Sequence, residues 1–305
     1  MTPDPVQPEE GTPPALRLSV AGMTIQVVAG ERDLTLAVEE PTARFLGGPG
    51  RPDCTVTAAW SEAVGANPGE LVFDAGSLWK LYRDGNRVHF VFLSEAVGPL
   101  PYKEAVLDSN FTSGEVLLNR SYFALAQGVF PLEYPLDELL IQGLLVRGRG
   151  AEVHACGVVE PSGRGLLFVG HSGAGKTTMA RLWQGVPGAR ILGDDRIIVR
   201  RAGRGFLMYG TPWHGEAELS EPGSAPLAGV FFLAPDVRNV LVPLTVPEAT
   251  ARLLACGFPP FYDRDGMSFT LGFLGEVAAA VPCQELRFSP DERVVEFVRA
   301  WVGGA

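Results

Sequence analysis

Residues 165–183 read GLLFVGHSGAGKTTMARLW, and this stretch decides how the chain is interpreted. From Gly170 to Thr177 it fits the pattern G-x-x-x-x-G-K-[ST], in which backbone N–H groups surround a phosphate and the lysine adds a positive charge. The flanks have the periodicities of a strand before the loop and of a helix after it, over residues 166–169 and at Met179, Leu182 and Trp183. A strand, a glycine-rich loop and a helix in this order predict a binding site for nucleotide phosphates.

Eight residues of this loop and of the first helical turn are expected to contact the phosphates: Gly170, Ser172, Gly173, Ala174, Gly175, Lys176, Thr177 and Thr178. Lys176 would reach the β- and γ-phosphates, and the hydroxyl of Thr177 would hold Mg²⁺, which prefers oxygen ligands. The chain has three lysines against 22 arginines. A lysine is suited to this position because a compact ammonium fits a tight loop better than a planar guanidinium does. The expected cofactors are therefore ATP and Mg²⁺.

Two adjacent aspartates, Asp194 and Asp195, follow Lys176 after one predicted helix and one predicted strand. A second apolar strand is predicted over residues 196–200. Adjacent residues of an extended segment point in opposite directions, so one carboxylate can face Mg²⁺ while the other is aimed elsewhere. The roles open to them are metal ligand and acceptor of a substrate hydroxyl proton. The alternative is an Asp-Asp turn that caps a loop.

Residues 151–305 resemble the C-terminal catalytic domain of the HPr kinase/phosphorylase family and its stand-alone HPr-kinase-like relatives. The segments that carry the resemblance are HACGV from His154, GHSGAGKTT from Gly170 and LGDD from Leu192. ATP-dependent phosphoenolpyruvate carboxykinase, which shares that fold, has the same order of loop and aspartates. The resemblance implies a mixed α/β fold of the phosphoenolpyruvate carboxykinase-like P-loop type and ATP-dependent phosphoryl transfer to a hydroxyl.

Carried over position by position, the resemblance implies that Lys176 and Thr177 act on phosphate and Mg²⁺. It also implies that the Asp194/Asp195 pair supplies the base and a metal contact, and that His154 lies near the transferred phosphate. The segment E-I-R-G-x-G of true HPr kinase/phosphorylases has no good copy here, where residues 208–216 read MYGTPWHGE. Glu216 in that segment is a further candidate ligand. The expected metal set is therefore Thr177, Asp195 and Glu216.

The remainder of the chain predicts four regions. Residues 1–15 have the composition of a disordered tail. Short alternating segments predict a β-rich N-terminal domain over residues 16–132, with a hairpin turn at Asp84-Gly85-Asn86. Residues 133–150 have the spacing of a connecting helix, and residues 151–305 form the predicted catalytic domain.

Composition excludes several classes of protein. The net charge of −10 argues against a nucleic-acid partner, because phosphate neutralisation needs a basic face. The four cysteines form no CxxC pair, so neither a zinc site nor a disulfide framework is indicated. No run reaches the roughly 20 apolar residues of a membrane span. We expect a cytoplasmic protein without a membrane partner, and a homo-oligomer remains open.

The leading functional prediction is an ATP- and Mg²⁺-dependent kinase that transfers the γ-phosphoryl group to a hydroxyl, here a serine of a small protein or peptide. A small-molecule kinase and a nucleotide-sensing binding protein without transfer activity are the alternatives. Six arginines cluster around the motifs, and one of them could stabilise the transferring group: Arg164, Arg190, Arg196, Arg200, Arg201 and Arg204. Their spacing does not say which one. Four aromatic residues could line a groove for adenine or for a peptide, with core packing as the alternative: Trp213, Phe258, Phe261 and Tyr262.

Overall fold

A computed structural model describes residues 14–76, 78–94 and 98–304. The chain divides into two compact units, the first containing Met23–Leu140 and the second Ile141–Ala305 together with Val20–Gly22. The predicted tail lies almost wholly outside the described residues, since the first strand begins at Ala15. The helix α1 (Leu136–Leu145) lies in the segment predicted to connect the two domains.

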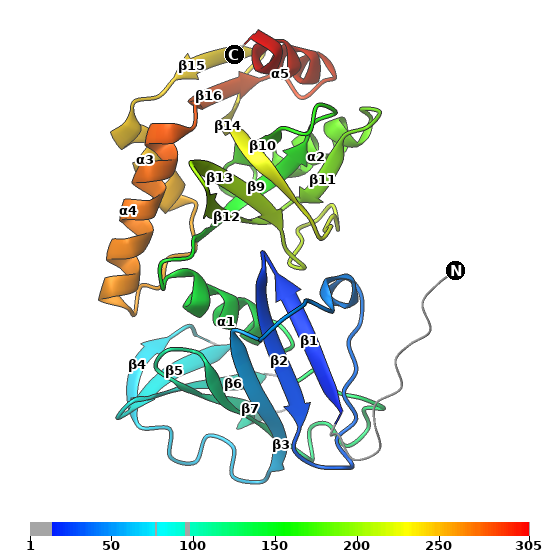
Figure 1. Cartoon of the computed structure of the whole chain (residues 1–305), viewed down its shortest axis with the longest axis vertical. Coiled ribbons are helices and arrows are strands. Elements are labelled where there is room, and N and C mark those ends of the chain that lie inside the picture. Colours follow the sequence, from blue (N-terminus) through cyan, green and yellow to red (C-terminus); the bar gives the residue numbers. More distant parts are fainter. Residues whose placement is uncertain (1–13, 77, 95–97, 305) are drawn as a thin grey trace. The chain divides into compact units, whose positions relative to one another are not determined.

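The first unit is built on an eight-stranded sheet with the order β1-β2-β3-β8-β7-β6-β5-β4 (Figure 1). The strands are β1 (Ala15–Val20), β2 (Met23–Ala29), β3 (Cys54–Ser61), β4 (Glu70–Asp74), β5 (Trp79–Asp84), β6 (Arg87–Ser94), β7 (Gly98–Asp108) and β8 (Ser113–Asn119). A short 3₁₀ helix spans Thr42–Phe45. The predicted hairpin turn joins β5 to β6, where Asp84 pairs with Arg87 and Gly85 takes a φ of 56°.

The second unit contains the strands β9 (Ala151–Val159), β10 (Gly165–Val169), β11 (Arg190–Gly193), β12 (Arg196–Ala202), β13 (Gly205–Gly210), β14 (Ser224–Pro235), β15 (Val240–Pro243) and β16 (Cys283–Phe288). The main order is β10-β9-β12-β13-β14-β16-β15, β11 pairs with β9, and β10 also pairs with β14. The pairings β9–β12–β13–β14–β10 therefore return to β9. These five strands form a closed circuit.

The predicted fold class is wrong. The structure is mostly β, with 40% strand and 21% helix in two large mixed sheets, and it is not an α/β fold of the phosphoenolpyruvate carboxykinase-like P-loop type. The physical reason is visible at β12 and β13, which are joined by the short turn at Gly203 (φ 57°) and pair antiparallel. A parallel pair needs a crossover of a dozen or more residues, which this connection is too short to make.

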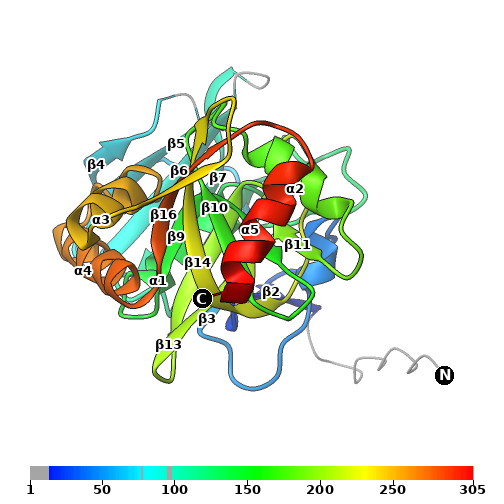
Figure 2. The ribbon, with the colours of Figure 1, turned by 90° about the horizontal axis from the view of Figure 1, so that it is seen from above.

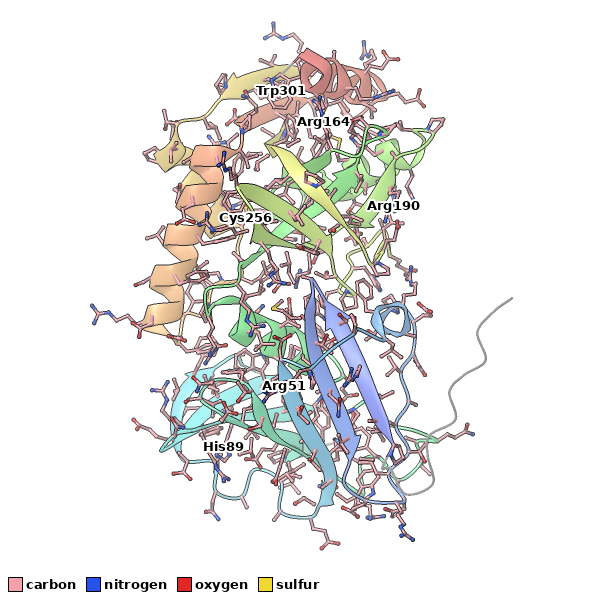
Figure 3. The ribbon with its side chains drawn as sticks, in the orientation of Figure 1. Arg51, His89, Arg164, Arg190, Cys256 and Trp301 are labelled. Carbon is pink, nitrogen blue, oxygen red and sulfur yellow. The ribbon has the colours of Figure 1, made fainter. Side chains whose placement is uncertain are left out.

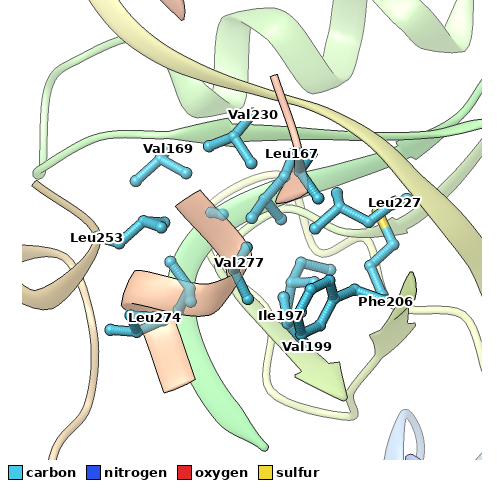
Figure 4. Packing of buried hydrophobic residues seen from close by; sticks show 14 of the residues in the cluster. Leu167, Val169, Ile197, Val199, Phe206, Leu227, Val230, Leu253, Leu274 and Val277 are labelled. Carbon is cyan, nitrogen blue, oxygen red and sulfur yellow. The ribbon is translucent and has the colours of Figure 1, made fainter. Parts of the chain in front are cut away.

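Helices pack on both faces of the second sheet because successive side chains of a strand point to opposite faces (Figure 2). Leu167 and Val169 join the core beneath α3 (Val246–Ala255) and α4 (Arg264–Ala280), which Figure 4 shows in close-up. Leu166 and Phe168 join the core beneath α2 (Lys176–Gln184) and α5 (Arg293–Gly304). The strand β10, which leads into the glycine-rich loop, is thereby buried on both faces.

Candidate phosphate-binding site

The glycine-rich loop joins β10 to α2, as the sequence predicts. Gly173 and Gly175 take φ values of 81° and 106°, which glycine adopts at little cost. A Cβ at Gly175 would lie 2.7 Å from Cζ of Phe288, and one at Gly170 would lie 2.6 Å from the Cβ of Ala174. Side chains larger than hydrogen are therefore excluded at positions where the backbone must turn. Residues 171–173 of the loop are exposed.

Lys176 begins α2 and bends back over the loop. Its Nζ donates to the carbonyl oxygens of Gly170 at 3.0 Å and His171 at 3.2 Å, and the residue is only 7% exposed. Burial lowers the pKa of Lys176, and the nearby Asp195 carboxylate opposes that effect. The ammonium is held inside the loop by weak neutral acceptors. A phosphate oxygen, which carries charge, is a stronger partner for it.

The register between β9 and β12 brings His154 and Asp195 together although 41 residues separate them. His154 pairs with Arg196 across the two antiparallel strands, and the N–H of Ala155 donates to the carbonyl of Asp195 at 3.0 Å. His154 Nε2 lies 2.7 Å from Oδ1 of Asp195, and a guanidinium nitrogen of Arg196 contacts Oδ2. Both carboxylate oxygens of Asp195 thus face a basic group.

The charges around Asp195 keep it ionised. Burial by itself raises the pKa of this carboxyl, but the hydrogen bond from His154 and the charges of Arg196, His154 and Lys176 together hold its pKa below the usual value. Cys256 links this pair to the glycine-rich loop, because its carbonyl accepts the N–H of His154 at 2.7 Å and its Sγ lies 3.9 Å from both ring nitrogens of His171 in the loop. The loop and the second predicted motif therefore belong to one site.

Asp194 occupies a different environment from its neighbour. Its Oδ1 accepts the N–H of Gly215 and its Oδ2 accepts the N–H of Ala217, each at 2.8 Å, and the residue is 1% exposed. Glu216, predicted as a metal ligand, lies between these two donors and is exposed. The Asp194 carboxylate therefore anchors the turn of residues 215–217. This contact resembles the alternative considered from the sequence, in which an aspartate of the pair caps a loop.

Cys256 and Phe258 also border the site. Phe258 is one of the four aromatic residues considered from the sequence as a groove, whereas no motif points to Cys256. The carbonyl of Cys256, labelled in Figure 3, accepts the N–H of His154 at 2.7 Å, and its Sγ lies 3.9 Å from both ring nitrogens of His171. The Phe258 ring lies 6.0 Å from that of His154 and 4.2 Å from the guanidinium carbon of Arg196. The aromatic content of this segment was its only sequence signal. Its contact with the loop could not be predicted, because Cys256 is 85 residues from His171 in the chain.

Oxygen donors are present for a cation that accompanies a nucleotide. Thr177 is partly exposed at the start of α2, and Asp195 is a carboxylate of the same site. Hydroxyl and carboxylate oxygens suit Mg²⁺, which completes its shell with water and phosphate. Within the described residues, no group of three or more His, Cys, Asp or Glu side chains is placed to hold a metal. The chemistry of the donors fits Mg²⁺ as a companion of the phosphates.

Comparison with known proteins leaves the family open. No known family model matches the chain, and no curated protein is detectably similar in sequence. A solved structure described as the Hpr(Ser) kinase/phosphatase from Coxiella burnetii aligns with 50% of this chain and 93% of its own, at 11% identity and a TM-score of 0.29. That likeness is too low to carry an argument about activity. In the part of the chain that the structure describes, no helix is long and apolar enough to cross a membrane.

Proposed function

We propose that the second unit binds ATP at the loop of residues 170–178 and transfers its γ-phosphoryl group to a hydroxyl. The observation that carries the proposal is that Cys256 contacts both His171 of the phosphate-type loop, which holds the buried Lys176, and His154 of the His154–Asp195 pair. A loop of this kind binds phosphate, and a carboxylate beside it can accept a proton. Together they suit phosphoryl transfer better than binding alone.

In the proposed reaction the bond between the γ-phosphorus and the bridging oxygen breaks, leaving ADP, as a bond from the acceptor oxygen to that phosphorus forms. The acceptor proton passes to Asp195, whose position His154 fixes through Oδ1. A weak base suffices, because the transition state is loose and proton removal is not demanding. Lys176 exchanges its carbonyl partners for phosphate oxygens. Mg²⁺, when held by the hydroxyl of Thr177, would supply further neutralisation of phosphate charge.

Asp194 has a supporting role in this proposal. Because its two oxygens are occupied by backbone donors, it holds the turn of residues 215–217 against the site and leaves the proton to Asp195. The proposed acceptor is a serine hydroxyl of a small protein or peptide. A small molecule with a hydroxyl group is the other candidate, and the experiment below separates the two by the size of the labelled product.

The test has two stages. Titration calorimetry with ATP and Mg²⁺ should show binding by the wild type and a loss of at least about tenfold in Lys176→Ala, since a charged partner of the phosphates is removed. Lys80→Ala, which changes a partly exposed lysine of the first unit, is the matched control. Incubation with γ-labelled ATP in an extract of the host should then label an acceptor, and Lys176→Ala and Asp195→Asn should abolish the label.

Each outcome separates the candidate functions. Wild-type protein that binds no nucleotide contradicts the proposal. Wild-type protein that binds ATP but labels nothing above the Asp195→Asn background supports the nucleotide sensor instead. A labelled product that passes a dialysis membrane identifies a small-molecule kinase.

A further inference from the structure

Among the six arginines around the nucleotide motifs, the structure sets Arg196 apart. Arg190 pairs with Glu221 and Arg201 with Glu276, both about half exposed, and neither acid belongs to the site. Arg164 donates to the carbonyl of Val302 and Arg200 to that of Arg149. Arg204 lies exposed in the turn that follows β12. Only Arg196 of these six described residues contacts Asp195, and its charge is one of those that act on Lys176.

The guanidinium of Arg196 is held by more than its contact with Asp195. Its carbon lies 4.2 Å from the centroid of the Phe258 ring, and its Nε lies 3.9 Å from Oε1 of Glu152. The Glu152 side chain is fully buried, and Gln142 donates to its Oε2 at 3.0 Å. The Arg196 side chain itself is 17% exposed. A guanidinium that stacks on an aromatic ring beside a buried acid keeps its place even when one carboxylate partner leaves.

We infer that Arg196 binds the terminal phosphate of the nucleotide and gives up Asp195 in order to do so. This inference rests on the proposed function and deepens it, because it assigns the residue that distinguishes a nucleoside triphosphate from a diphosphate. A terminal phosphate carries more charge than a carboxylate and offers the paired oxygens that a guanidinium fork matches. The terminal phosphate can therefore replace Asp195 as the partner of the Arg196 guanidinium, which is already desolvated and oriented.

The exchange also prepares Asp195 for its proposed task. In the structure His154 contacts Oδ1 and Arg196 contacts Oδ2, so both carboxylate oxygens are engaged. When a terminal phosphate replaces Asp195 as the partner of Arg196, Oδ2 is released while His154 still fixes the other oxygen. The base then becomes free only when a terminal phosphate is present.

The experiment measures binding of ADP and of the non-hydrolysable analogue adenylyl imidodiphosphate, each with Mg²⁺ at one salt concentration. Arg196→Met should weaken binding of the analogue by about 10- to 100-fold, the range for loss of a charge-assisted hydrogen-bonded partner. Binding of ADP should weaken by less than about threefold, because ADP lacks the phosphate in question. Arg201→Met, on the same strand, pairs with Glu276 outside the site and should change neither affinity.

Repeating the measurement in an Asp195→Asn protein separates contact of Arg196 with phosphate from simple neutralisation of the Asp195 charge. If Arg196 acts only by cancelling the charge of Asp195, the effect of Arg196→Met disappears in an Asp195→Asn protein; if it binds phosphate, the effect persists. Arg196→Lys, which keeps the charge but not the fork, should retain ADP binding and lose part of the preference for the analogue. Thermal melting followed by circular dichroism checks that each variant is folded. If Arg196→Met does not fold, the comparison of the two nucleotides is made with Arg196→Lys.

Three results overturn the inference while leaving the proposed function intact: equal weakening for both nucleotides, unchanged affinity for the analogue, or loss of the effect in the Asp195→Asn protein. Wild-type protein that binds neither nucleotide overturns the proposed function, and the assignment of Arg196 falls with it.

Discussion

Replacing Asp194 with alanine should destabilise the second unit. Its carboxylate accepts two backbone N–H bonds at 2.8 Å and is 1% exposed. A hydrogen bond to a charged group contributes about 1.5–3 kcal/mol, so two such bonds set a ceiling of about 3–6 kcal/mol. The donors, Gly215 and Ala217, are partly exposed, and water can replace part of what they lose. We therefore expect the free energy of unfolding to fall by about 2–4 kcal/mol.

Urea unfolding followed by tryptophan fluorescence measures this loss. Trp213 is buried, 7% exposed, and lies two residues before Gly215, so it reports on the turn that Asp194 anchors. Subtracting the signal of a Trp213→Phe protein isolates its contribution. The matched control is Asp236→Ala, because Asp236 also accepts two backbone N–H groups but does so at an exposed loop. The control should lose less than about 1 kcal/mol. A loss in Asp194→Ala no greater than in the control would refute the anchoring role.

Three further predictions concern the loop, a helix cap and a buried lysine. Gly175→Ala should abolish measurable ATP binding, because the added Cβ meets the Phe288 ring at 2.7 Å and strains a φ of 106°; calorimetry showing wild-type affinity would contradict this. Thr245→Ala removes the capping box that begins α3 and should lower stability by about 1 kcal/mol in urea unfolding. Burial lowers the pKa of Lys103 to about 8 from 10.5, so the unfolded chain binds more protons between those values and stability rises with pH across that window. Lys103→Met should flatten that rise, whereas Lys80→Met, at a partly exposed position, should keep it. Equal pH slopes of stability for wild type and Lys103→Met would contradict the lowered pKa of Lys103.

Local patterns were the part of the structure that the sequence predicted well. The strand before Gly170, the helix after Gly175 and the strands on either side of the aspartates all occur where their periodicities place them. These elements are specified by residues close together in the chain. An apolar run or a helical spacing carries the information by itself.

Strand pairing was the part that the sequence did not determine. A glycine turn at residue 203 makes β12 and β13 a hairpin, and the expected α/β arrangement does not form. Which strand lies beside which depends on contacts between distant segments, and no short motif encodes them. The same holds for Cys256 and Phe258, which reach the site from the end of α3 and the segment after it.

The adjacent aspartates show the limit of reasoning from residue type. Alternation along a strand predicts that the two carboxylates point apart, but both residues lie in the bend between β11 and β12, and a Cβ at Gly215 would lie 3.1 Å from Oδ2 of Asp194 and 3.4 Å from Oδ1 of Asp195. Their partners still differ, since Asp194 accepts from the turn of residues 215–217 and Asp195 contacts His154. Which of the two would face the site could not be decided from the pair itself. That choice is made by the partners, two backbone donors in one case and two basic side chains in the other.

The strand β9 explains how these partners come to one place. Cys156 and Val158 face the core beneath α2, whereas Val153 and Ala155 face the core beneath α3 and α4. Alternation puts Glu152 and His154 on the same face as Cys156, so the acid beside Arg196 and the histidine beside Asp195 share one side of one strand.

A slip of one residue between β9 and β12 would turn this set to the opposite face and separate it from the loop. Gly157 helps to hold the register, because a Cβ there would lie 2.5 Å from Cδ1 of Ile197. The fit of the Ile197 side chain against this glycine therefore helps to place the start of β12, with Asp195 and Arg196, beside His154. The chemistry proposed for the second unit thus depends on the register of a β pair as much as on the glycine-rich loop.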